Sequence, residues 1–282
     1  MRRVSDSRCF RQASRGFTLV EMIIAIVITG ILVAMVSMFG RRQIDAYIDV
    51  SNRAELSDAA DTALRRMARD LQAALPNSVR NVSPLFLEFV PIRAAGRYRA
   101  EVGGGAGDDP LDFTSATDNS FDVLGPTVNI GAGEALVIFN LGQTGSDVYS
   151  NVPAQSSRRA ATAGANLSKV TFAPAGVQFP LASPQNRFQI VGQPVSYECA
   201  GNAAHPELGT VIRHTGYGFL PAQPTVFSTG TSAVLVGDVA ACSFSYTPAV
   251  LQRNGLVVIS LTLTRNGESV VLMHQIDVLN TP

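Results

Sequence analysis

The sequence contains no tryptophan, three histidines, three cysteines and a single lysine, Lys169. Charged residues make up 16% of the chain, well below the roughly 25% of an ordinary soluble domain. Because basic and acidic residues are equal at 22 each, the composition excludes a strongly basic nucleic-acid-binding protein, and we expect no nucleic acid partner. The apolar share of 46% excludes intrinsic disorder, whereas the aromatic share of 7% argues against a large aromatic core.

The polar residues form no recognisable catalytic motif. The three histidines, at positions 205, 214 and 274, have neither HExxH nor i, i+4 spacing. No Gly-x-Ser-x-Gly elbow occurs, and the glycine-rich residues 103–107 lack the spacing of a phosphate-binding loop. We therefore expect no enzymatic activity, no cofactor and no metal. One alternative stays open, a calcium site in the loop that carries Asp108, Asp109, Asp112, Asp118 and Asp122.

The first forty residues combine a basic leader with a long apolar run. Residues 1–16 carry five arginines against one aspartate, and residues 17–40 contain a single charged group, Glu21. As a helix this run is about 36 Å long, which exceeds the membrane hydrocarbon thickness of about 30 Å. Its apolar side chains contribute about −6 kcal/mol to insertion, against about +3 kcal/mol for the acid. We therefore predict one membrane-spanning helix over 17–40, with the leader in the cytoplasm and the remainder exported.

Three interpretations of this segment differ in how they treat Glu21. A cleaved secretory signal has an apolar core of only about 7–15 residues, which is shorter than this run. A plain membrane anchor accounts for the length and the leader but not for an acid near the start of the apolar helix. Intramembrane acids are costly and point by default to a function. A protonated or snorkelling Glu21 without a role is the remaining alternative.

Residues 15–21 read RGFTLVE, and this run behind a basic leader resembles the processing motif of type IV prepilins. The resemblance implies that a prepilin peptidase cleaves after Gly16 and methylates the new amine of Phe17. Glu21 then becomes the fifth residue of the mature chain. The resemblance also implies that the helix over 17–40 is the element through which the protein assembles with other pilins or pseudopilins.

Elementary electrostatics agrees with that role for Glu21. Cleavage creates a cationic amine at Phe17, four residues from Glu21 and on the same side of the helix. In a bundle of such helices, Glu21 of one subunit can neutralise the amine of a neighbour. Such a pair removes two isolated charges from a low-dielectric environment, where either alone is costly. We therefore expect Glu21 to set the axial register of assembly.

Residues 41–75 are predicted to continue the helix in amphipathic form until Pro76 ends it. Apolar residues recur at intervals of three or four and form one stripe. The stripe consists of Leu56, Ala60, Leu64, Met67, Leu71 and Leu75. The opposite face carries Arg65, Arg66 and Arg69, with Asp61 and Asp70 as neighbouring acids. We expect a solvated charged face opposite a stripe that packs on a sheet.

Residues 76–282 have the sequence pattern of a β-rich globular domain. Strand-like runs occur at 85–92, 135–139, 188–191, 195–199, 210–214 and 242–246. Asn266-Gly267 lies between two further runs, 256–265 and 268–279, and predicts a hairpin with a type I′ turn. The polar segments 103–120 and 140–168 are expected to be surface loops. The prediction is an α+β fold in which the long N-terminal helix packs on one antiparallel β-sheet domain, as in pilins.

The cysteines are consistent with export. Cys9 lies in the leader and leaves with it, so Cys199 and Cys242 remain as an even pair. In an oxidising periplasm we expect them to form a disulfide. Closing a loop of about 44 residues stabilises the folded state by roughly 4 kcal/mol in the chain-entropy account. A metal site is the weaker reading, because no CxxC or paired-histidine spacing accompanies them.

Several further stretches resemble minor pilins of the mannose-sensitive haemagglutinin (MSHA) pilus. They are residues 63–66, 69–71, 74–80, 94–99, 187–188, 194–197 and 274–278. The resemblance implies an inner-membrane protein with a periplasmic domain, which takes part in starting or capping a surface fibre. Two alternatives stay open: a J-type minor pseudopilin of type II secretion, and a membrane-anchored adhesin or binding module that merely uses this helix.

Overall fold

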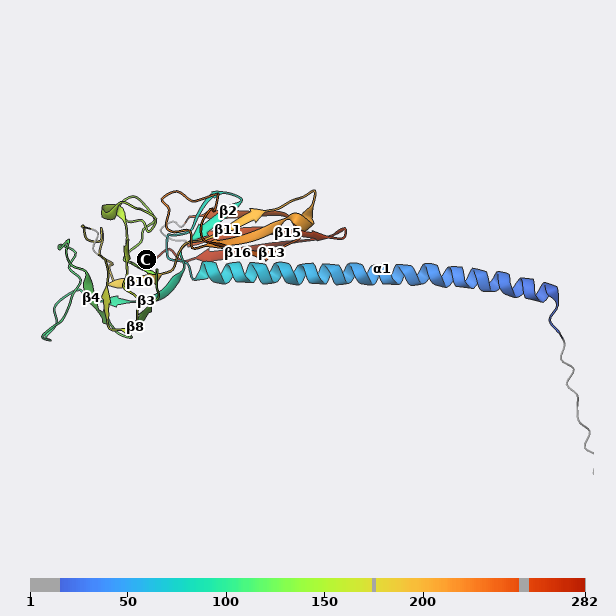
Figure 1. Cartoon of the computed structure of the whole chain (residues 1–282), viewed down its shortest axis with the longest axis horizontal. Coiled ribbons are helices and arrows are strands. Elements are labelled where there is room, and N and C mark those ends of the chain that lie inside the picture. Colours follow the sequence, from blue (N-terminus) through green and yellow to red (C-terminus); the bar gives the residue numbers. More distant parts are fainter. Residues whose placement is uncertain (1–15, 174–175, 249–253, 282) are drawn as a thin grey trace, which may run out of the picture. The chain divides into compact units, whose positions relative to one another are not determined.

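The computed structural model describes residues 16–173, 176–248 and 254–281, apart from the side chains of 40–42. The predicted leader therefore lies almost wholly outside the described residues. The chain divides into two compact units, Met1–Ser51 and Asn52–Pro282. A single helix, α1 (Leu19–Gln72), contributes to both (Figure 1). The boundary between the units falls within this helix, so its last turns belong with the β-domain.

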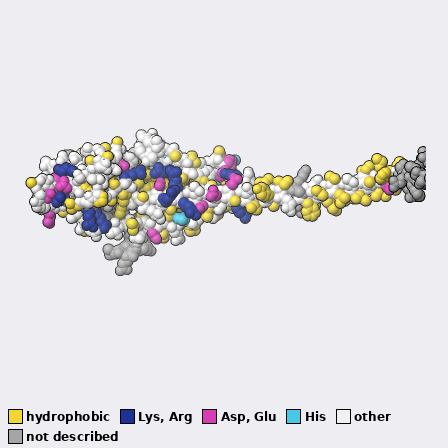
Figure 2. All heavy atoms as spheres, turned by 90° about the horizontal axis from the view of Figure 1, so that it is seen from below, with side chains coloured by type: hydrophobic (Ala, Val, Ile, Leu, Met, Phe, Trp, Pro, Cys, Tyr) yellow, Lys and Arg dark blue, Asp and Glu magenta, His cyan; other side chains and the backbone are white. Residues whose placement is uncertain are grey.

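The first unit consists of the apolar part of α1. Every described side chain from residue 16 to 39 is exposed, among them Ile23 at 52% and Phe39 at 67%. Hydrophobic side chains dominate this part of the helix in the space-filling view (Figure 2). An 18-residue window has a mean hydropathy of 2.8 and no buried residue. In the described part of the chain, α1 is thus long and apolar enough to cross a membrane.

In the second unit, residues 52–72 of α1 lie on β-strands. The predicted stripe is buried, with Leu56, Ala60, Leu64, Met67 and Leu71 each at most 2% exposed. The helix ends at Gln72, three residues before the predicted end, because the chain turns there to pair Ala74 with Pro91. Leu75 is buried as expected but belongs to a separate cluster with Val90 and Val137.

Two antiparallel sheets enclose the core that α1 covers. The five-stranded sheet has the order β1-β2-β11-β12-β13 and the three-stranded sheet the order β14-β15-β16. The first is built from β1 (Arg80–Ser83), β2 (Phe86–Phe89), β11 (Val195–Ala200), β12 (Thr210–Thr215) and β13 (Thr231–Val236), with the short 3-10 helix η2 (Pro206–Leu208) before β12. The second is built from β14 (Val239–Thr247), β15 (Gly255–Arg265) and β16 (Glu268–Val278). Helix followed by antiparallel sheets confirms the α+β prediction.

A third, six-stranded sheet of order β7-β6-β10-β3-β4-β9 surrounds its own core. Its strands are β3 (Ile92–Tyr98), β4 (Ser120–Leu124), β6 (Ala135–Val137), β7 (Arg158–Ala160), β9 (Lys169–Thr171) and β10 (Arg187–Val191), and a two-stranded ribbon of β5 (Val128–Ile130) and β8 (Gly164–Leu167) accompanies it. Phe121 lies 5.2 Å from Phe188 and 5.9 Å from Tyr98 between ring centroids, both edge-on. The expectation of no large aromatic core was wrong, because the few aromatic residues are concentrated here.

The hairpin at Asn266-Gly267 is confirmed. Both residues have positive φ, at 52° and 85°, as a type I′ turn requires, and eleven cross-strand pairs run from Arg265–Glu268 to Gly255–Val278. The run at 85–92 is instead divided between β2 and β3. Pro91 lies at the break, where a residue without a backbone N–H cannot continue a ladder.

Residues 140–168 were wrongly predicted to be a surface loop. The segment contains the 3-10 helix η1 (Pro153–Gln155), β7 and β8, and Asn140, Ser157 and Arg159 are each less than 5% exposed. The Asn140 amide donates to the Pro76 carbonyl at 2.8 Å and accepts from Val148 N at 2.8 Å. These polar side chains can be buried because they form hydrogen bonds with one another and with the backbone inside the fold.

Candidate processing site and the attachment of its helix

The predicted cleavage residues lie immediately before α1. Gly16 and Phe17 are outside the helix and exposed, with Phe17 at 81%. A Cβ added to Gly16 would meet no atom within 4 Å. The described part of the chain therefore has no steric need for glycine at this position. The predicted cleavage point thus lies between two residues that are exposed in the described part of the chain.

Thr18 and Glu21 form a reciprocal cap at the start of α1. Glu21 N donates to Thr18 Oγ1 at 3.3 Å, and Thr18 N donates to Glu21 Oε2 at 3.4 Å. This is the capping-box arrangement, in which two otherwise unpaired amide groups at a helix start are satisfied. Thr18 was not predicted as a cap, although its Thr-x-x-Glu spacing is the signal for such a box.

Of the predicted site residues, Gly16 and Phe17 precede the helix, and Glu21 lies in its first turn. In the uncleaved chain, the Glu21 carboxylate faces the amide just after Phe17, at the positive end of the helix dipole. Cleavage after Gly16 would place a full positive charge one residue away from that amide. The arrangement is suited to holding or exchanging a carboxylate–amine contact, as the assembly hypothesis requires.

Polar contacts secure the last turns of α1 to the β-domain. Asp70 accepts from Tyr197 Oη at 2.7 Å and from Arg213 Nε at 3.1 Å. Burial, and secondarily the Asp70 carboxylate, raises the pKa of Tyr197, so its phenol stays a donor. Nearer the first unit, Arg53 pairs with Glu268 at 2.6 Å. Residues 52–72 therefore make polar contacts with the β-domain near both ends, and those of Asp70 are the more buried.

This geometry corrects the prediction for the charged face. Arg65 pairs with Asp61 at 2.6 Å as expected, but Asp70 turns toward the sheet and does not accompany Arg66. Arg66 and Arg69 have no ion-pair partner among the described residues. The sequence pattern placed Asp70 on the solvated face because helical periodicity alone cannot show that β11 and β12 present a tyrosine and an arginine there.

A buried polar network joins β1, β2 and β11. Glu88, with no exposed surface, accepts from Arg80 Nε at 2.5 Å and from Tyr217 Oη at 2.8 Å. Because the Tyr217 hydroxyl uses its hydrogen to donate to Glu88, the Ser196 hydroxyl donates to Tyr217 at 2.9 Å. Burial raises the pKa of Glu88 although Arg80 opposes the rise. No local pattern predicts this network, because its members are spread over more than a hundred residues.

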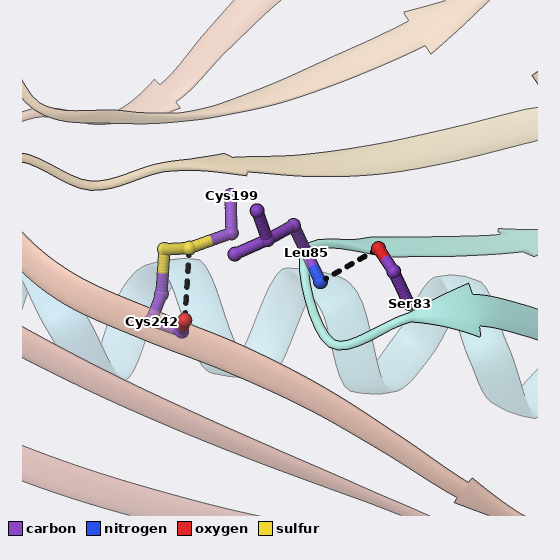
Figure 3. Close-up of a disulfide and its surroundings, with 4 residues drawn as sticks. All are labelled: Ser83, Leu85, Cys199 and Cys242. Carbon is purple, nitrogen blue, oxygen red and sulfur yellow. Dashed lines mark hydrogen bonds between the residues drawn. A yellow bond between two sulfur atoms is a disulfide. The ribbon is translucent and has the colours of Figure 1, made fainter. Parts of the chain in front are cut away.

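The predicted disulfide between Cys199 and Cys242 is present (Figure 3). Cys199 lies in β11 and Cys242 in β14, with 5.7 Å between their Cα atoms, so the bond links the five-stranded to the three-stranded sheet. Cys199 Sγ lies 2.9 Å from the Cys242 carbonyl oxygen. Leu85 is beside the bond, its carbonyl accepting from Cys199 N at 2.8 Å and its own N donating to Ser83 Oγ at 3.3 Å.

Other chemistry-bearing side chains are engaged in local contacts. Asp122 pairs with Arg99 at 3.1 Å and Asp109 with Lys169 at 2.8 Å, which leaves these carboxylates occupied. Across the described ranges, no three His, Cys, Asp or Glu side chains gather as a metal-ligand group. His214 lies between Ser232 Oγ at 2.7 Å and Glu198 Oε2 at 2.8 Å, and its ring stacks on Phe227.

Comparison with known proteins finds a family match near the N-terminus of the chain. Residues 11–37 match the family described as the prokaryotic N-terminal methylation motif. The match contains Gly16, Phe17 and Glu21. No curated protein and no solved structure matches the chain. The motif, the apolar helix and the α+β architecture support a type IV pilin-like or pseudopilin-like protein, processed by a prepilin peptidase and anchored by one membrane helix.

Proposed function

We propose that the protein is a minor pilin of an MSHA-type type IV pilus, which helps to initiate the fibre or to form its tip after processing. It acts as a structural subunit without enzymatic activity. The observation that carries the proposal is the matched motif over 11–37, whose cleavage point lies exposed directly before a capped apolar helix. That combination suits a helix that is released from its leader and then joins other helices.

The proposed sequence of events follows from charge. The arginine-rich leader stays in the cytoplasm, and the domain from residue 52 onward is exported to the periplasm. Prepilin peptidase cleaves after Gly16 and methylates the Phe17 amine. Glu21 then exchanges its contact with Thr18 N for the amine of a neighbouring subunit. That pairing brings subunits into axial register, because a mismatched pair leaves two charges isolated in an apolar environment.

The stretches that resemble MSHA minor pilins meet one another in the fold. Residues 69–71 and 194–197 are joined by the contact between Asp70 and Tyr197. Residues 94–99 and 187–188 are adjacent strands, in which the Phe188 ring lies directly over Gly96. These contacts show where the stretches lie in the fold, and the MSHA-type assignment itself rests on their resemblance in sequence.

The function is tested on the native protein. Mass spectrometry of the mature chain should show an N-terminal methylated Phe17. Deletion should abolish surface fibres and attachment, whereas retention of exoproteins in the periplasm would assign the chain to type II secretion as a J-type pseudopilin. An anchored adhesin would keep its binding activity when Gly16 is replaced by an uncleavable residue. A mature chain that begins at Met1 would overturn all processing-dependent readings.

A further inference from the structure

Two arginines face each other across the six-stranded sheet. Arg97 of β3 and Arg187 of β10 are direct Cα partners in the antiparallel ladder, so their side chains leave the same face of the sheet. Directly opposed residues have Cβ atoms about 5 Å apart, and like charges in this relation repel. Arg97 is exposed and Arg187 half-buried. The fold therefore anchors two arginine side chains next to each other on a sheet face that solvent reaches.

Neighbouring arginines form ion pairs with acidic side chains of the same chain, whereas, among the described residues, Arg97 and Arg187 do not. Arg99, two residues beyond Arg97, contacts both Asp108 at 3.2 Å and Asp122 at 3.1 Å. Arg93, on the same face of β3, lies 4.0 Å from Glu134. Within the part of the chain that the structure describes, neither Arg97 nor Arg187 has a carboxylate within ion-pair distance. Both guanidinium groups keep their donors for a ligand.

The neighbours of the pair on this sheet face are neutral. Across the ladder from Arg97 in β4 lies Leu124, which is 43% exposed, and Ala95 and Gln189 are the next cross-strand pair along. Gln189 is 7% exposed, and its buried Oε1 lacks a hydrogen-bond donor. The surroundings thus offer no internal counter-charge, and they place an exposed apolar side chain beside the two cations.

We propose that Arg97 and Arg187 form a binding site for an oxyanion, a sulfate, phosphate or carboxylate group, on the surface of the domain. The planar guanidinium fork matches such groups with paired N–H donors, and two forks side by side supply more donors than one anion needs. Bound anion also removes the repulsion between the arginines. The same group can belong to a free ion or to an acidic saccharide, whose ring would rest on Leu124.

The test uses the full chain in a non-ionic detergent, titrated with sodium sulfate at constant ionic strength against sodium chloride. The Leu124 methyl resonances, assigned through Leu124→Ile, report occupancy. We expect a saturable shift that weakens about tenfold in Arg97→Gln or Arg187→Gln and disappears in the double variant. The double variant should fold, because it relieves a repulsion. Arg66→Gln with Arg69→Gln removes the same charge from α1 and should leave the response intact.

A non-saturating shift, or an equal shift in the double variant, would overturn the site. A second arm replaces sulfate with a sulfated disaccharide and with trigalacturonate. Saccharide binding at least tenfold tighter than sulfate, and lost in the double variant, assigns the oxyanion to a glycan. Equal affinities assign it to the free ion.

Discussion

The carboxylate of Asp70, near the end of α1, accepts a hydrogen bond from Tyr197 in β11 at 2.7 Å while Arg213 of β12 binds the same oxygen. Three elements therefore converge on one atom that is largely shielded from solvent. Because an ionised acceptor strengthens a hydrogen bond, this contact contributes more than an exposed ion pair.

Tyr197→Phe should lower the free energy of unfolding by about 1.5–3 kcal/mol, because it removes one donor and leaves the carboxylate partly unsatisfied. The measurement is urea unfolding of the full chain in detergent. Asp61→Asn, which breaks only the exposed contact with Arg65, is the matched control and should change stability by less than about 0.5 kcal/mol. Equal effects of the two variants would show that the helix is held by the apolar stripe alone.

Gly96→Ala should destabilise the six-stranded sheet. A Cβ at position 96 would lie 2.8 Å from two atoms of the Phe188 ring, which is itself buried in the aromatic core. Overpacking of this kind costs about 1–3 kcal/mol. Gly104→Ala, where a new Cβ meets nothing within 4 Å, serves as the control in the same thermal-unfolding series.

Loss of the disulfide should be the most costly single change to the domain. Replacing Cys199 and Cys242 by serine is expected to lower stability by about 4 kcal/mol, because the reduced chain gains the freedom of the loop between them. Reductant should lower the unfolding midpoint of the wild type and leave that of the double variant unchanged. A reductant effect that persists in the variant would point to another cause.

The cap and the assembly role of Glu21 can be separated. Thr18→Ala removes the hydroxyl that caps α1, at a cost of about 1 kcal/mol in helix stability, and leaves the Glu21 carboxylate in place. We expect normal cleavage and near-normal incorporation into fibres. Glu21→Val should be inserted and cleaved but incorporated poorly. Incorporation is measured by quantifying the protein in sheared fibres. Identical defects in both variants would assign Glu21 to capping alone.

Glu88 should give stability a recognisable pH dependence. Its folded-state pKa is raised above the ordinary value of 4.5, chiefly by burial. The folded state therefore holds this proton when the unfolded state has released it, and the contribution of Glu88 to stability falls as pH rises above 4.5. The difference in unfolding free energy between wild type and Glu88→Gln should decline over that window. A difference that grows with pH would show that Arg80 outweighs burial.

The sequence predicted those structural elements that depend on residues close together in the chain. Pro76 and the spacing of apolar residues located the end of α1 to within three residues, and Asn266-Gly267 gave the hairpin, because each depends on neighbouring residues. The disulfide followed from there being two cysteines after the leader. The resemblance at 15–21 predicted a processing site, and the family match over 11–37 covers the same residues.

What sequence reasoning missed depends on partners far along the chain. Asp70 was placed on the solvated face, since its partners Tyr197 and Arg213 lie more than 120 residues away. The polar segment 140–168 was taken for a loop, although Asn140 bonds back to Pro76. A polar segment is exposed only when no distant residue supplies hydrogen-bond partners for it. The sequence does not show which distant residues will lie close enough to do so.

The attachment of α1 has a mechanical consequence. Residues 52–72 are pinned near one end by the bond of Arg53 to Glu268 and near the other by Asp70, with the apolar stripe between. Because Arg53 is exposed, the buried stripe and the Asp70 contacts would carry most of a load applied along the helix axis. Cys199–Cys242 ties the two receiving sheets covalently, so a force passed from the helix to one of these sheets would reach the other through a covalent bond.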